Sequence, residues 1–392
     1  MILPKDCRRV AGVMSGTSLD GIDVVIADLQ GHGRQLRVIA WYGASFAFSE
    51  ELADSLGKAA SEEYIGVAEL SQLNVRLAYE YVQAITRTLA TREDSTQSLD
   101  LVGCHGQTIR HLPDKVPCLG MGIHSTFQIG DPATMAQLLG IPVIGDFRLA
   151  DMACGGQGAP LVPYFDYVIF THDTEVRGCL NLGGVANLTV LPPGAHADQV
   201  YGFDTGPANM IIDALCSRLL DLPFDEGGNI AKSGMVNEAL LSELLQDTYF
   251  LSEPPKSTGR DYLNHAFLRR LLDQSDRIPA EDLIATATAL TARSVWQAYQ
   301  AFVEPQYAIN RLIVSGGGAH NRTLMDLLRD CFAHNRCMVD IETSDSYGIG
   351  VDSKEALCFA VLAHETANGI PTSMPSVTGA DRPAVLGKLC VP

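Results

Sequence analysis

The chain has 392 residues, of which 46% are hydrophobic and 19% charged, and its formal net charge at pH 7 is −18. Its length favours two domains, its composition is that of a globular protein, and its acidic surface argues against a nucleic-acid partner. No apolar run approaches the roughly 20 residues of a membrane helix, and the start, MILPKDCRRV, lacks an apolar signal region, so we expect a cytoplasmic protein without a membrane partner.

The first part of the chain alternates between strand-like and helix-like patterns. An antiparallel meander of three strands is predicted over 10–14, 22–30 and 35–46. Helical periodicity then extends over 49–60 and 62–92. Further strands are predicted over 100–106, 126–130 and 141–147, and Asp131 is expected to cap a helix over 131–140. The element order is β-β-β-α-β-α-β.

A second series of the same kind follows. Three more strands are predicted over 178–184, 185–191 and 200–204. Helices are expected over 206–220, about 235–246, 261–273, 281–303 and 353–368. The strand 311–318 enters a glycine turn and is followed by a helix and by the strand CMVDIE, 337–342. This repeat in element order suggests two related α/β domains.

The cysteines and histidines give little sign of a metal site or a disulfide framework. The ten cysteines are scattered without a C-x-x-C pair, and most lie in apolar stretches, so we expect reduced core thiols. His105 and His111 are six residues apart, a spacing that does not place them on one helix face, and no third ligand accompanies them. We therefore expect no metal at this pair.

The loop in GVMSGTSLDGIDVV, residues 12–25, lies between two predicted strands and contains several glycines and hydroxyl residues. It is not a Walker A loop, because G-K-S/T is missing and a strand follows where a helix would. It is not the G-x-S-x-G turn of a serine hydrolase either. Two interpretations remain: a hairpin whose backbone N–H groups and hydroxyls hold an anion, or an ordinary turn.

Two further glycine turns favour the anion-binding interpretation. NLGGVANLT, residues 181–189, forms a second hairpin at the equivalent place in the second series. VSGGGAHN, residues 314–321, is a strand that ends in three glycines at the start of a helix, where the helix dipole favours anions. Two facing hairpins and a glycine-lined shelf for adenosine are the pattern of the superfamily of sugar kinases, actin and chaperone ATPases.

Ten motifs make the resemblance more specific. In chain order they are GVMSGTSLDGIDVV, GCHGQTIRH, QIGD, GDFRxxD, GGQGAPLVP, NLGGVANLT, GFDTGPANMIIDA, PKSTGRDY, VSGGGAHN and PSVTGA. Together they resemble the anhydro-N-acetylmuramic acid kinase family over nearly the whole chain. The resemblance implies an α/β fold of two facing actin-like (ribonuclease H-like) domains with an ATP and sugar cleft between them. It also implies a homodimer.

The activity implied by this resemblance belongs to cell-wall recycling. An enzyme of this family opens 1,6-anhydro-N-acetylmuramic acid with water and phosphorylates oxygen 6 from ATP, with Mg²⁺, to give N-acetylmuramic acid 6-phosphate. We expect the first domain to comprise residues 1–145 and about 370–392, with the first hairpin. The second would comprise 146–369, with the second hairpin and the adenosine-side turn. A helix after residue 353 is expected to cross between them.

The resemblance also assigns the residues that bind ATP. They are Gly16, Thr17, Ser18, Leu19, Asp20, Gly21, Ile22, Asp23, Gly183, Gly184, Asn187, Gly316, Gly317, Gly318 and Asn321. Val13 and Met14 stand where many superfamily members carry an aspartate, so their magnesium geometry cannot be copied. We expect Asp20 to reach Mg²⁺ through water. Asp23 can equally be a surface carboxylate on the second strand.

Asp204, in GFDTGPAN, suits the role of general base that opening the anhydro bridge requires. It lies at the end of a predicted strand, just before Gly206 and Pro207. A carboxylate at this position can alternatively cap the helix predicted over 206–220. The resemblance assigns this aspartate the role of base.

The expected sugar-binding residues are His105, Gln107, Thr108, Arg148 and Glu355. Arg148, with Arg110 as a second candidate, can pair with the lactyl carboxylate of a muramic acid. Leu149 and Ala150 stand where family sequences often have more arginine, which leaves the sugar's identity open. Glu355 can alternatively be a solvated helix cap. Lys256 and Arg260 either contact phosphate or sugar, or belong to a polar connection.

Three other functions compete with this interpretation. The first is a kinase for a different 1,6-anhydro sugar, such as levoglucosan, which lacks the acyl and lactyl groups. The second is a non-catalytic ATP-binding protein of the actin or chaperone kind, against which the compact acidic chain argues. The third is a cofactor-free hydrolase, which the missing serine turn and metal set disfavour.

Overall fold

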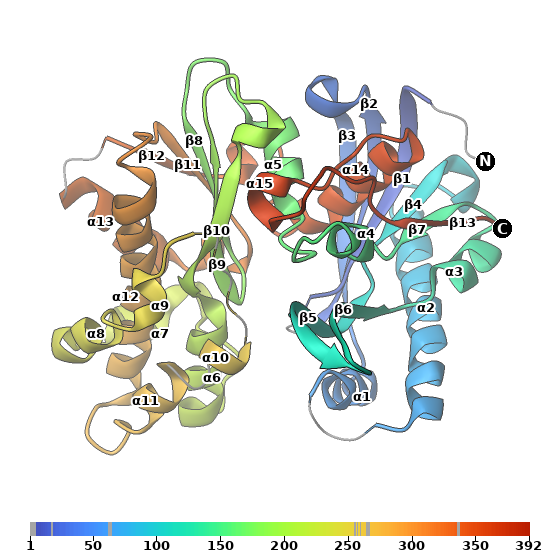
Figure 1. Cartoon of the computed structure of the whole chain (residues 1–392). Coiled ribbons are helices and arrows are strands. Elements are labelled where there is room, and N and C mark those ends of the chain that lie inside the picture. The colour runs from blue at the N-terminus through green and yellow to red at the C-terminus, as the bar shows by residue number, and fades with distance from the viewer. Residues whose placement is uncertain are drawn as a thin grey trace. The chain divides into compact units, whose positions relative to one another are not determined.

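The computed structural model describes residues 5–16, 19–61, 65–254, 256, 258, 260–263, 267–334 and 338–392. The chain divides into two compact units (Figure 1). Unit 1 comprises Met1–Ile169 and Ser353–Pro392, and unit 2 comprises Phe170–Asp352. Among the described residues no helix is both long and apolar enough to cross a bilayer. Every described cysteine is a free thiol, and Cys337 lies outside the described residues.

Unit 1 is built on a six-stranded mixed sheet with the order β13-β7-β4-β1-β2-β3. Its strands are β1 (Cys7–Met14), β2 (Gly21–Gln30), β3 (Arg37–Ala47), β4 (Leu101–Cys104), β7 (Val143–Gly145) and β13 (Lys388–Cys390). Its helices are α1 (Glu50–Ala60), α2 (Val67–Ala90), α3 (Pro132–Leu139), α4 (Leu149–Ala153), α5 (Val162–Phe170, whose last residue belongs to unit 2), α14 (Lys354–Ala367) and α15 (Pro375–Thr378).

The two faces of this sheet are covered differently. Side chains of alternate strand residues such as Val13 and Val102 form one apolar core with α1, α2 and α3. On the other face α14 packs directly on the strands, because Gly12 and Gly103 have no side chain. A Cβ atom at Gly12 would overlap the backbone of Ala356, and one at Gly103 would overlap that of Phe359. The two glycines therefore fix α14 to unit 1.

Unit 2 contains a five-stranded mixed sheet with the order β10-β9-β8-β11-β12. Its strands are β8 (Arg177–Leu182), β9 (Val185–Leu191), β10 (Tyr201–Pro207), β11 (Arg311–Ser315) and β12 (Asp340–Thr343). Its helices are α6 (Asn209–Leu220), α7 (Asn229–Ser233), α8 (Glu238–Leu244), α9 (Thr248–Leu251), α10 (Arg260–Leu263), α11 (Arg269–Leu272), α12 (Ala280–Ala298) and α13 (Arg322–His334). α12 and α13 cover one face of the sheet through an apolar core.

The strand order is the same in both units. In unit 1 the first five strands lie in the order β3-β2-β1-β4-β7, and the corresponding order in unit 2 is β10-β9-β8-β11-β12. In both, the second strand is antiparallel to its two neighbours, and the first strand is parallel to the fourth. The predicted α/β class and the repeat of two ribonuclease H-like units are confirmed. The predicted cleft stays a prediction.

The units do not divide at the predicted positions. The division falls after Ile169 and after Asp352, whereas 145 and about 370 were expected. The difference has a physical cause, because α14 follows the division and packs mainly on β1, β2 and β4 of unit 1. The loop 154–158 likewise contacts the C-terminal segment: the Gln157 N–H donates to the Thr378 carbonyl (2.9 Å).

A two-stranded hairpin is inserted after β4, where one short strand was expected. β5 (Gln107–Cys118) and β6 (Met121–Ile129) pair only with each other among the described strands (Figure 1). Its even-numbered residues 124–128 on β6 are partly or fully buried, whereas Met121, Ile123 and Phe127 are exposed. One face of the hairpin therefore exposes several apolar side chains.

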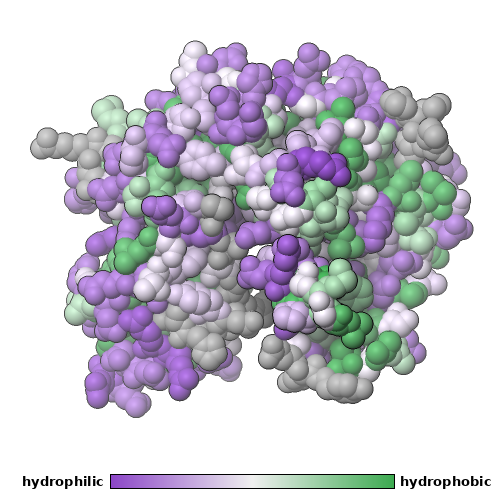
Figure 2. All heavy atoms as spheres, in the orientation of Figure 1, coloured by the Kyte–Doolittle hydropathy of each residue, from purple (hydrophilic) through white to green (hydrophobic). Residues whose placement is uncertain are grey.

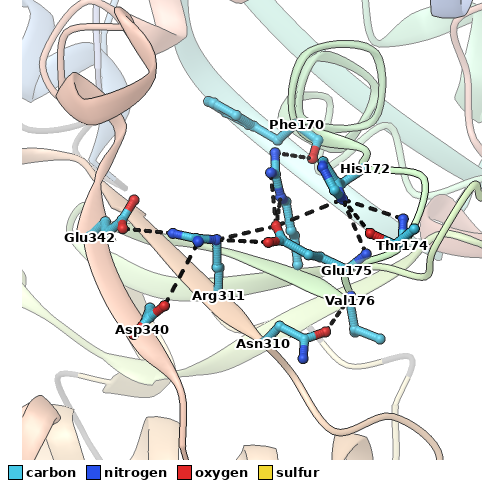
Figure 3. A network of polar contacts seen from close by, with 10 residues as sticks. Phe170, His172, Thr174, Glu175, Val176, Asn310, Arg311, Asp340 and Glu342 are labelled. Atoms are coloured by element: carbon cyan, nitrogen blue, oxygen red, sulfur yellow. Dashed lines mark hydrogen bonds and ion pairs between the residues drawn. The ribbon is translucent and has the colours of Figure 1, made fainter.

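Charged residues join the beginnings of the unit 2 strands (Figure 3). Arg311 on β11 contacts Glu175 (3.1 Å) and Glu342 on β12 (2.8 Å). Arg177 on β8 also contacts Glu175 (2.9 Å), whose carboxylate pKa these two arginines hold below its usual range. Because ligands of α/β sheets bind at the carboxyl ends of the strands, this network at the opposite ends is structural.

Candidate active site

The first hairpin turn, between β1 and β2, is braced by neighbouring elements of unit 1. Met14 pairs with Asp23, so residues 15–22 include the whole turn. The Gln107 side chain donates to the Gly16 carbonyl (3.1 Å), and the Ser15 and Tyr81 hydroxyls are 2.6 Å apart. Thr17 and Ser18, expected at the phosphates, lie outside the described residues.

The carboxylates of this hairpin differ in their surroundings. Asp20 is exposed, and its backbone carbonyl accepts the Phe48 N–H (3.1 Å). Asp23 lies on β2 opposite Ser45 of β3, and the Ser45 hydroxyl donates to its carboxylate (2.5 Å). Asp23 is therefore a partly buried strand carboxylate with a partner on the neighbouring strand, whereas Asp20 is open to solvent.

Three expected sugar-binding residues come together in unit 1. Nε and Nη2 of Arg148 lie 3.0 and 2.9 Å from Nε2 of His105, and Nη1 of Arg148 donates to the Gly158 carbonyl (2.8 Å). The charge of Glu355 acts on the same guanidinium: burial lowers the pKa of Arg148 to about 10, and Glu355 opposes this shift. Arg148 is therefore hydrogen-bonded to a histidine and a backbone carbonyl, and the charge of a carboxylate acts on it.

This cluster presents two buried polar atoms with no hydrogen-bond partner. A guanidinium can only donate, so Nε2 of His105 must accept and the ring proton lies on Nδ1. Burial and the charge of Arg148 hold the pKa of His105 well below its usual value, which keeps the ring neutral. Nδ1 of His105 and Oε1 of Gln107 are both unpartnered. A neutral donor and an acceptor are thus available to a polar ligand such as a sugar.

The other expected sugar contacts are placed on the hairpin. Thr108 accepts a hydrogen bond from the Gln128 side chain (3.3 Å) across β5 and β6. Nδ1 of His111 lies 3.0 Å from the Thr126 hydroxyl, and burial, with the charge of Arg148, lowers the pKa of His111 to about 4. Arg110 is exposed on β5. Within the described part of the chain, no group of three or more His, Cys, Asp or Glu side chains is arranged to hold a metal ion.

A buried aspartate that the sequence analysis did not single out holds the loop beside Arg148. Asp151 is fully buried and accepts the Gly158 N–H (2.8 Å) and the hydroxyls of Ser373 and Thr378 (both 2.7 Å). It thereby connects the GGQG and PSVTGA motifs, and Gly158 in turn binds Arg148. The two motifs were visible in the sequence, but their contact was not.

In unit 2 a row of polar residues crosses the strand ends. Asp204 of β10 lies opposite Asn187 of β9, Asn187 opposite Asn181 of β8, and Asn181 opposite Ser315 of β11. Their chain neighbours, such as Phe203 and Leu188, enter the core beneath α12 and α13. Because strand side chains alternate, the four polar side chains share the other face of the sheet. Of the predicted residues, the structure thus brings Asp204 and Asn187 together.

Asp204 is not the cap of the following helix. β10 continues to Pro207, α6 begins at Asn209, and the N-cap residue is Ala208. The Asp204 carboxylate instead accepts the Thr258 N–H (2.9 Å). Burial raises the pKa of Asp204 to about 7, against the lowering effects of this hydrogen bond and of the Lys256 charge. At neutral pH such a carboxylate can accept or release a proton.

The glycines of the second and third glycine turns, both in unit 2, fall into two groups. Gly316 (φ +82°) and Gly318 pack against the second hairpin: a Cβ atom at Gly316 would lie 2.7 Å from Asn181 Oδ1, and one at Gly318 would lie 2.6 Å from Leu182 Cβ. Gly183 and Gly317 have no such neighbour, because their nearest contacts would be at 3.5 Å. Gly184 is similar, with its nearest contact at 3.4 Å from Met210. The second group therefore offers uncovered backbone that a phosphate can approach.

Asn321 has a structural partner that the sequence analysis missed. Its side chain accepts the Leu324 N–H at the start of α13 (2.9 Å). It also packs against Gly228 (φ +75°), whose carbonyl accepts the Thr323 hydroxyl (2.7 Å). The sequence analysis predicted no helix or strand between the helices over 206–220 and about 235–246. The pair Gly227–Gly228 was the available signal for a close approach to another segment.

The protein consists of two α/β units that share one strand topology, and each unit has a glycine turn between its strands. The family model for anhydro-N-acetylmuramic acid kinase matches residues 8–392. A kinase of that name from Salinibacter ruber is 49% identical over 387 residues, covering 98% of this chain and 96% of its own. One from Bacillus cereus strain G9842 is 40% identical, with 98% and 99% covered. The chain belongs to the anhydro-N-acetylmuramic acid kinase family, and it is an enzyme.

Solved structures show only distant similarity. Component A of the (R)-2-hydroxyglutaryl-CoA dehydratase of Acidaminococcus fermentans is 10% identical with a TM-score of 0.45, covering 92% of this chain and 99% of its own. A ROK family glucokinase from Streptomyces griseus, in complex with glucose and AMPPNP, is 12% identical with a TM-score of 0.37, covering 91% and 99%.

Proposed function

We propose that this enzyme uses ATP to convert 1,6-anhydro-N-acetylmuramic acid into N-acetylmuramic acid 6-phosphate, the reaction of peptidoglycan recycling. The observation that carries the proposal is the match to the family model over residues 8–392. The chemistry of Asp204 supports it, because ring opening by water requires a base that works near neutral pH. The proposed location is the cytoplasm.

Asp204 has the proposed role of general base. It takes a proton from water while the water oxygen forms a bond to carbon 1. The bond between carbon 1 and the bridge oxygen breaks, and its electron pair stays on that oxygen. The oxygen becomes oxygen 6 and bonds to the γ-phosphorus while the bond from phosphorus to ADP breaks. Asp204 then releases its proton to solvent.

The remaining residues have proposed binding roles. His105, Gln107, Thr108, Arg148 and Glu355 would hold the sugar; the unpartnered atoms of His105 and Gln107 support this assignment. Arg148 would pair with the lactyl carboxylate. Gly183 and Gly317 would border the phosphates, with the other predicted residues of the three turns. Mg²⁺ would neutralise phosphate charge, and the exposed carboxylate of Asp20 offers the oxygen ligand that it prefers, through water.

The product identifies the reaction. The protein is incubated with ATP, Mg²⁺ and 1,6-anhydro-N-acetylmuramic acid in ¹⁸O-water, with levoglucosan in a parallel reaction. We expect the muramic sugar to gain one phosphate and one water, with the label at carbon 1 and none in the ester bridge. Turnover of levoglucosan alone would assign the enzyme to a simpler anhydro sugar. ATP binding without turnover of either sugar would overturn the proposal.

The second copy in the proposed homodimer would pack on the face of the β5–β6 hairpin that exposes Met121, Ile123 and Phe127. Leu119 at its tip is fully exposed, Met121 is 67% exposed, and Figure 2 shows hydrophobic residues at the surface in this region of unit 1. Self-association would bury these exposed apolar side chains, and a two-fold axis would bring the same face of both copies together. Light scattering tests this: Met121→Glu should give a monomer, and a wild-type monomer would refute it.

A further inference from the structure

The segment that contains Lys256 lies beside Asp204 and holds it at three points. The Asp204 N–H donates to the Lys256 carbonyl (3.1 Å), and the Asp204 carboxylate accepts the Thr258 N–H (2.9 Å). The Tyr249 hydroxyl donates to the Asp204 carbonyl (2.7 Å). Tyr249, Lys256 and Thr258 therefore determine both the backbone position of Asp204 and the direction of its carboxylate.

The side chain of Lys256 fixes this segment. Its ammonium group donates to the carbonyls of Tyr249 (3.1 Å) and Phe250 (3.4 Å) at the end of α9. It also lies 4.8 Å from the ring centroids of both Tyr249 and Phe302, and 6.0 Å from that of Phe203. A cation surrounded by aromatic rings and carbonyl oxygens is held in place electrostatically. Its location is thus set by groups of unit 2 and needs no phosphate or sugar.

We propose that Lys256 is a positioning residue of the ring-opening reaction, which orients the Asp204 carboxylate through Thr258 and favours its ionised form through its own positive charge. This inference rests on the proposed function. The sequence analysis left open whether Lys256 contacts phosphate or sugar or belongs to a polar connection. A substrate contact and a fixed internal cation predict different kinetics, so the inference can be tested against the first interpretation. Lys256 itself does not touch the reacting atoms.

The charged and titratable groups around Asp204 are few. Among the described residues of unit 2, Lys256 and Tyr249 are the titratable groups that interact with it. Tyr249 is in turn faced by Tyr262, whose hydroxyl contacts Asp247 (2.5 Å). α12 presents the Ser294 hydroxyl at Gly206, and it does not titrate in the working range. Lys256 is therefore the one described cation that favours the ionised form of Asp204.

The lysine is charged at neutral pH. Burial lowers the pKa of Lys256 to about 8, and the charge of Asp204 opposes this shift. Replacement of Lys256 by a neutral residue leaves the burial of Asp204 but removes the opposing charge. The pKa of Asp204 should then rise further above its present value of about 7.

The test compares Lys256→Met, Lys256→Arg and the exposed control Lys232→Met by the pH dependence of kcat. For Lys256→Met we expect the rising limb of kcat to move up by about one pH unit, so that activity lost at pH ~7 returns at pH ~9. KM for ATP and for the sugar should change less than about twofold, because uniform binding is not altered. Lys256→Arg and Lys232→Met should keep the wild-type profile.

Two results would overturn the inference. One is an unmoved pH profile in a folded Lys256→Met protein. The other is a KM for ATP or sugar raised about tenfold at unchanged kcat, which would make Lys256 a substrate contact. Failure of the proposed function is recognised separately, because the wild-type protein would then not phosphorylate the sugar. In that case the Asp204 titration is followed by infrared spectroscopy of its carboxyl band, which Asp204→Asn identifies and Lys256→Met should shift to higher pH.

Discussion

At the scale of single residues, Asp204 stands out in unit 2 by its position, its hydrogen bonds and its raised pKa. It lies in the middle of β10, it does not cap α6, and it receives a backbone N–H from a residue far along the chain. Burial is the largest influence on its pKa, which lies near 7. Carboxylates with such values are candidates for proton transfer, since the same group is a usable base and a usable acid near neutral pH.

Asp204→Asn should abolish most turnover without loss of binding. The amide keeps the shape of the side chain and can still accept the Thr258 N–H, but it cannot take a proton from water. We expect kcat to fall by about 10²–10⁴-fold, with dissociation constants for ATP and sugar close to wild type by calorimetry. The exposed Asp276→Asn serves as the control. A variant that keeps half of the wild-type turnover would remove Asp204 from the mechanism.

The pH dependence of the wild-type enzyme follows from the same residue. A base must be deprotonated to act, so activity is present above the pKa of Asp204 and is lost as the pH falls through it. Because this pKa is raised to about 7, kcat should be half-maximal near pH 7. Well below that pH it should fall about tenfold per pH unit. A plateau that extends down to pH ~5 would show that an unshifted carboxylate, or none, is the base.

At the scale of elements, the glycine turns separate into positions that the fold requires and positions that it leaves open. Gly12 and Gly103 let α14 lie on the unit 1 sheet, and Gly316 and Gly318 let the third turn pack on the second hairpin. A side chain at any of these four would meet protein atoms closer than 3.0 Å. Gly183 and Gly317 make no such contact. Packing therefore does not require glycine at these two positions. A phosphate that approaches the backbone would require it.

This difference predicts opposite outcomes for neighbouring substitutions. Gly183→Val and Gly317→Val should weaken ATP binding at least about tenfold while thermal stability stays near wild type, because the added atoms enter ligand space. Gly318→Val should instead reduce the free energy of unfolding by about 1–3 kcal/mol through overpacking. Gly66→Ala, where nothing lies near the added Cβ, is the control for ATP binding. Near-normal ATP affinity in folded Gly183→Val would contradict the phosphate assignment.

At the scale of the whole molecule, the excess of acidic residues produces a negative electrostatic potential over the surface. A net charge of −18 repels itself across the surface, and such self-repulsion opposes the compact state. Most ion pairs of the described residues are exposed and contribute little. The pair of Lys354 and Asp166 (2.6 Å) is the buried exception in unit 1, with side chains only 2% and 3% exposed. It adjoins Glu355 at the start of α14.

Salt should therefore stabilise the protein at alkaline pH. Between about 20 and 200 mM KCl the Debye length shortens enough to screen surface repulsion. We expect Tm at pH ~8 to rise over this range, and to change little near the isoelectric point of about 4.9, where the net charge vanishes. Thermal unfolding at both pH values measures the effect. A Tm that falls with salt at pH ~8 would mean that attractive surface pairs outweigh the net repulsion.

The sequence by itself determined the elements whose signals are local. Hydrophobic alternation and glycine turns predicted both meanders, the doubled α/β topology and the strand that carries Asp204, although this strand continues to Pro207. The ordered motifs were sufficient to indicate the family, and Asp131 was found where the sequence placed it, as the cap of α3. These features depend on residues within a few positions of one another, so their pattern is readable along the chain.

Only the tertiary structure decided which distant residues meet. The interaction of Asp204 with Thr258 and Lys256 spans about fifty residues, and Asp151 reaches Ser373 and Thr378 across more than two hundred. The assignment of α14 to unit 1 likewise depended on two glycines on strands far from it in sequence. Burial, and with it the raised pKa of Asp204, results from the sum of such contacts. No local pattern encodes that sum, because it arises from the packing of segments that are adjacent only after folding.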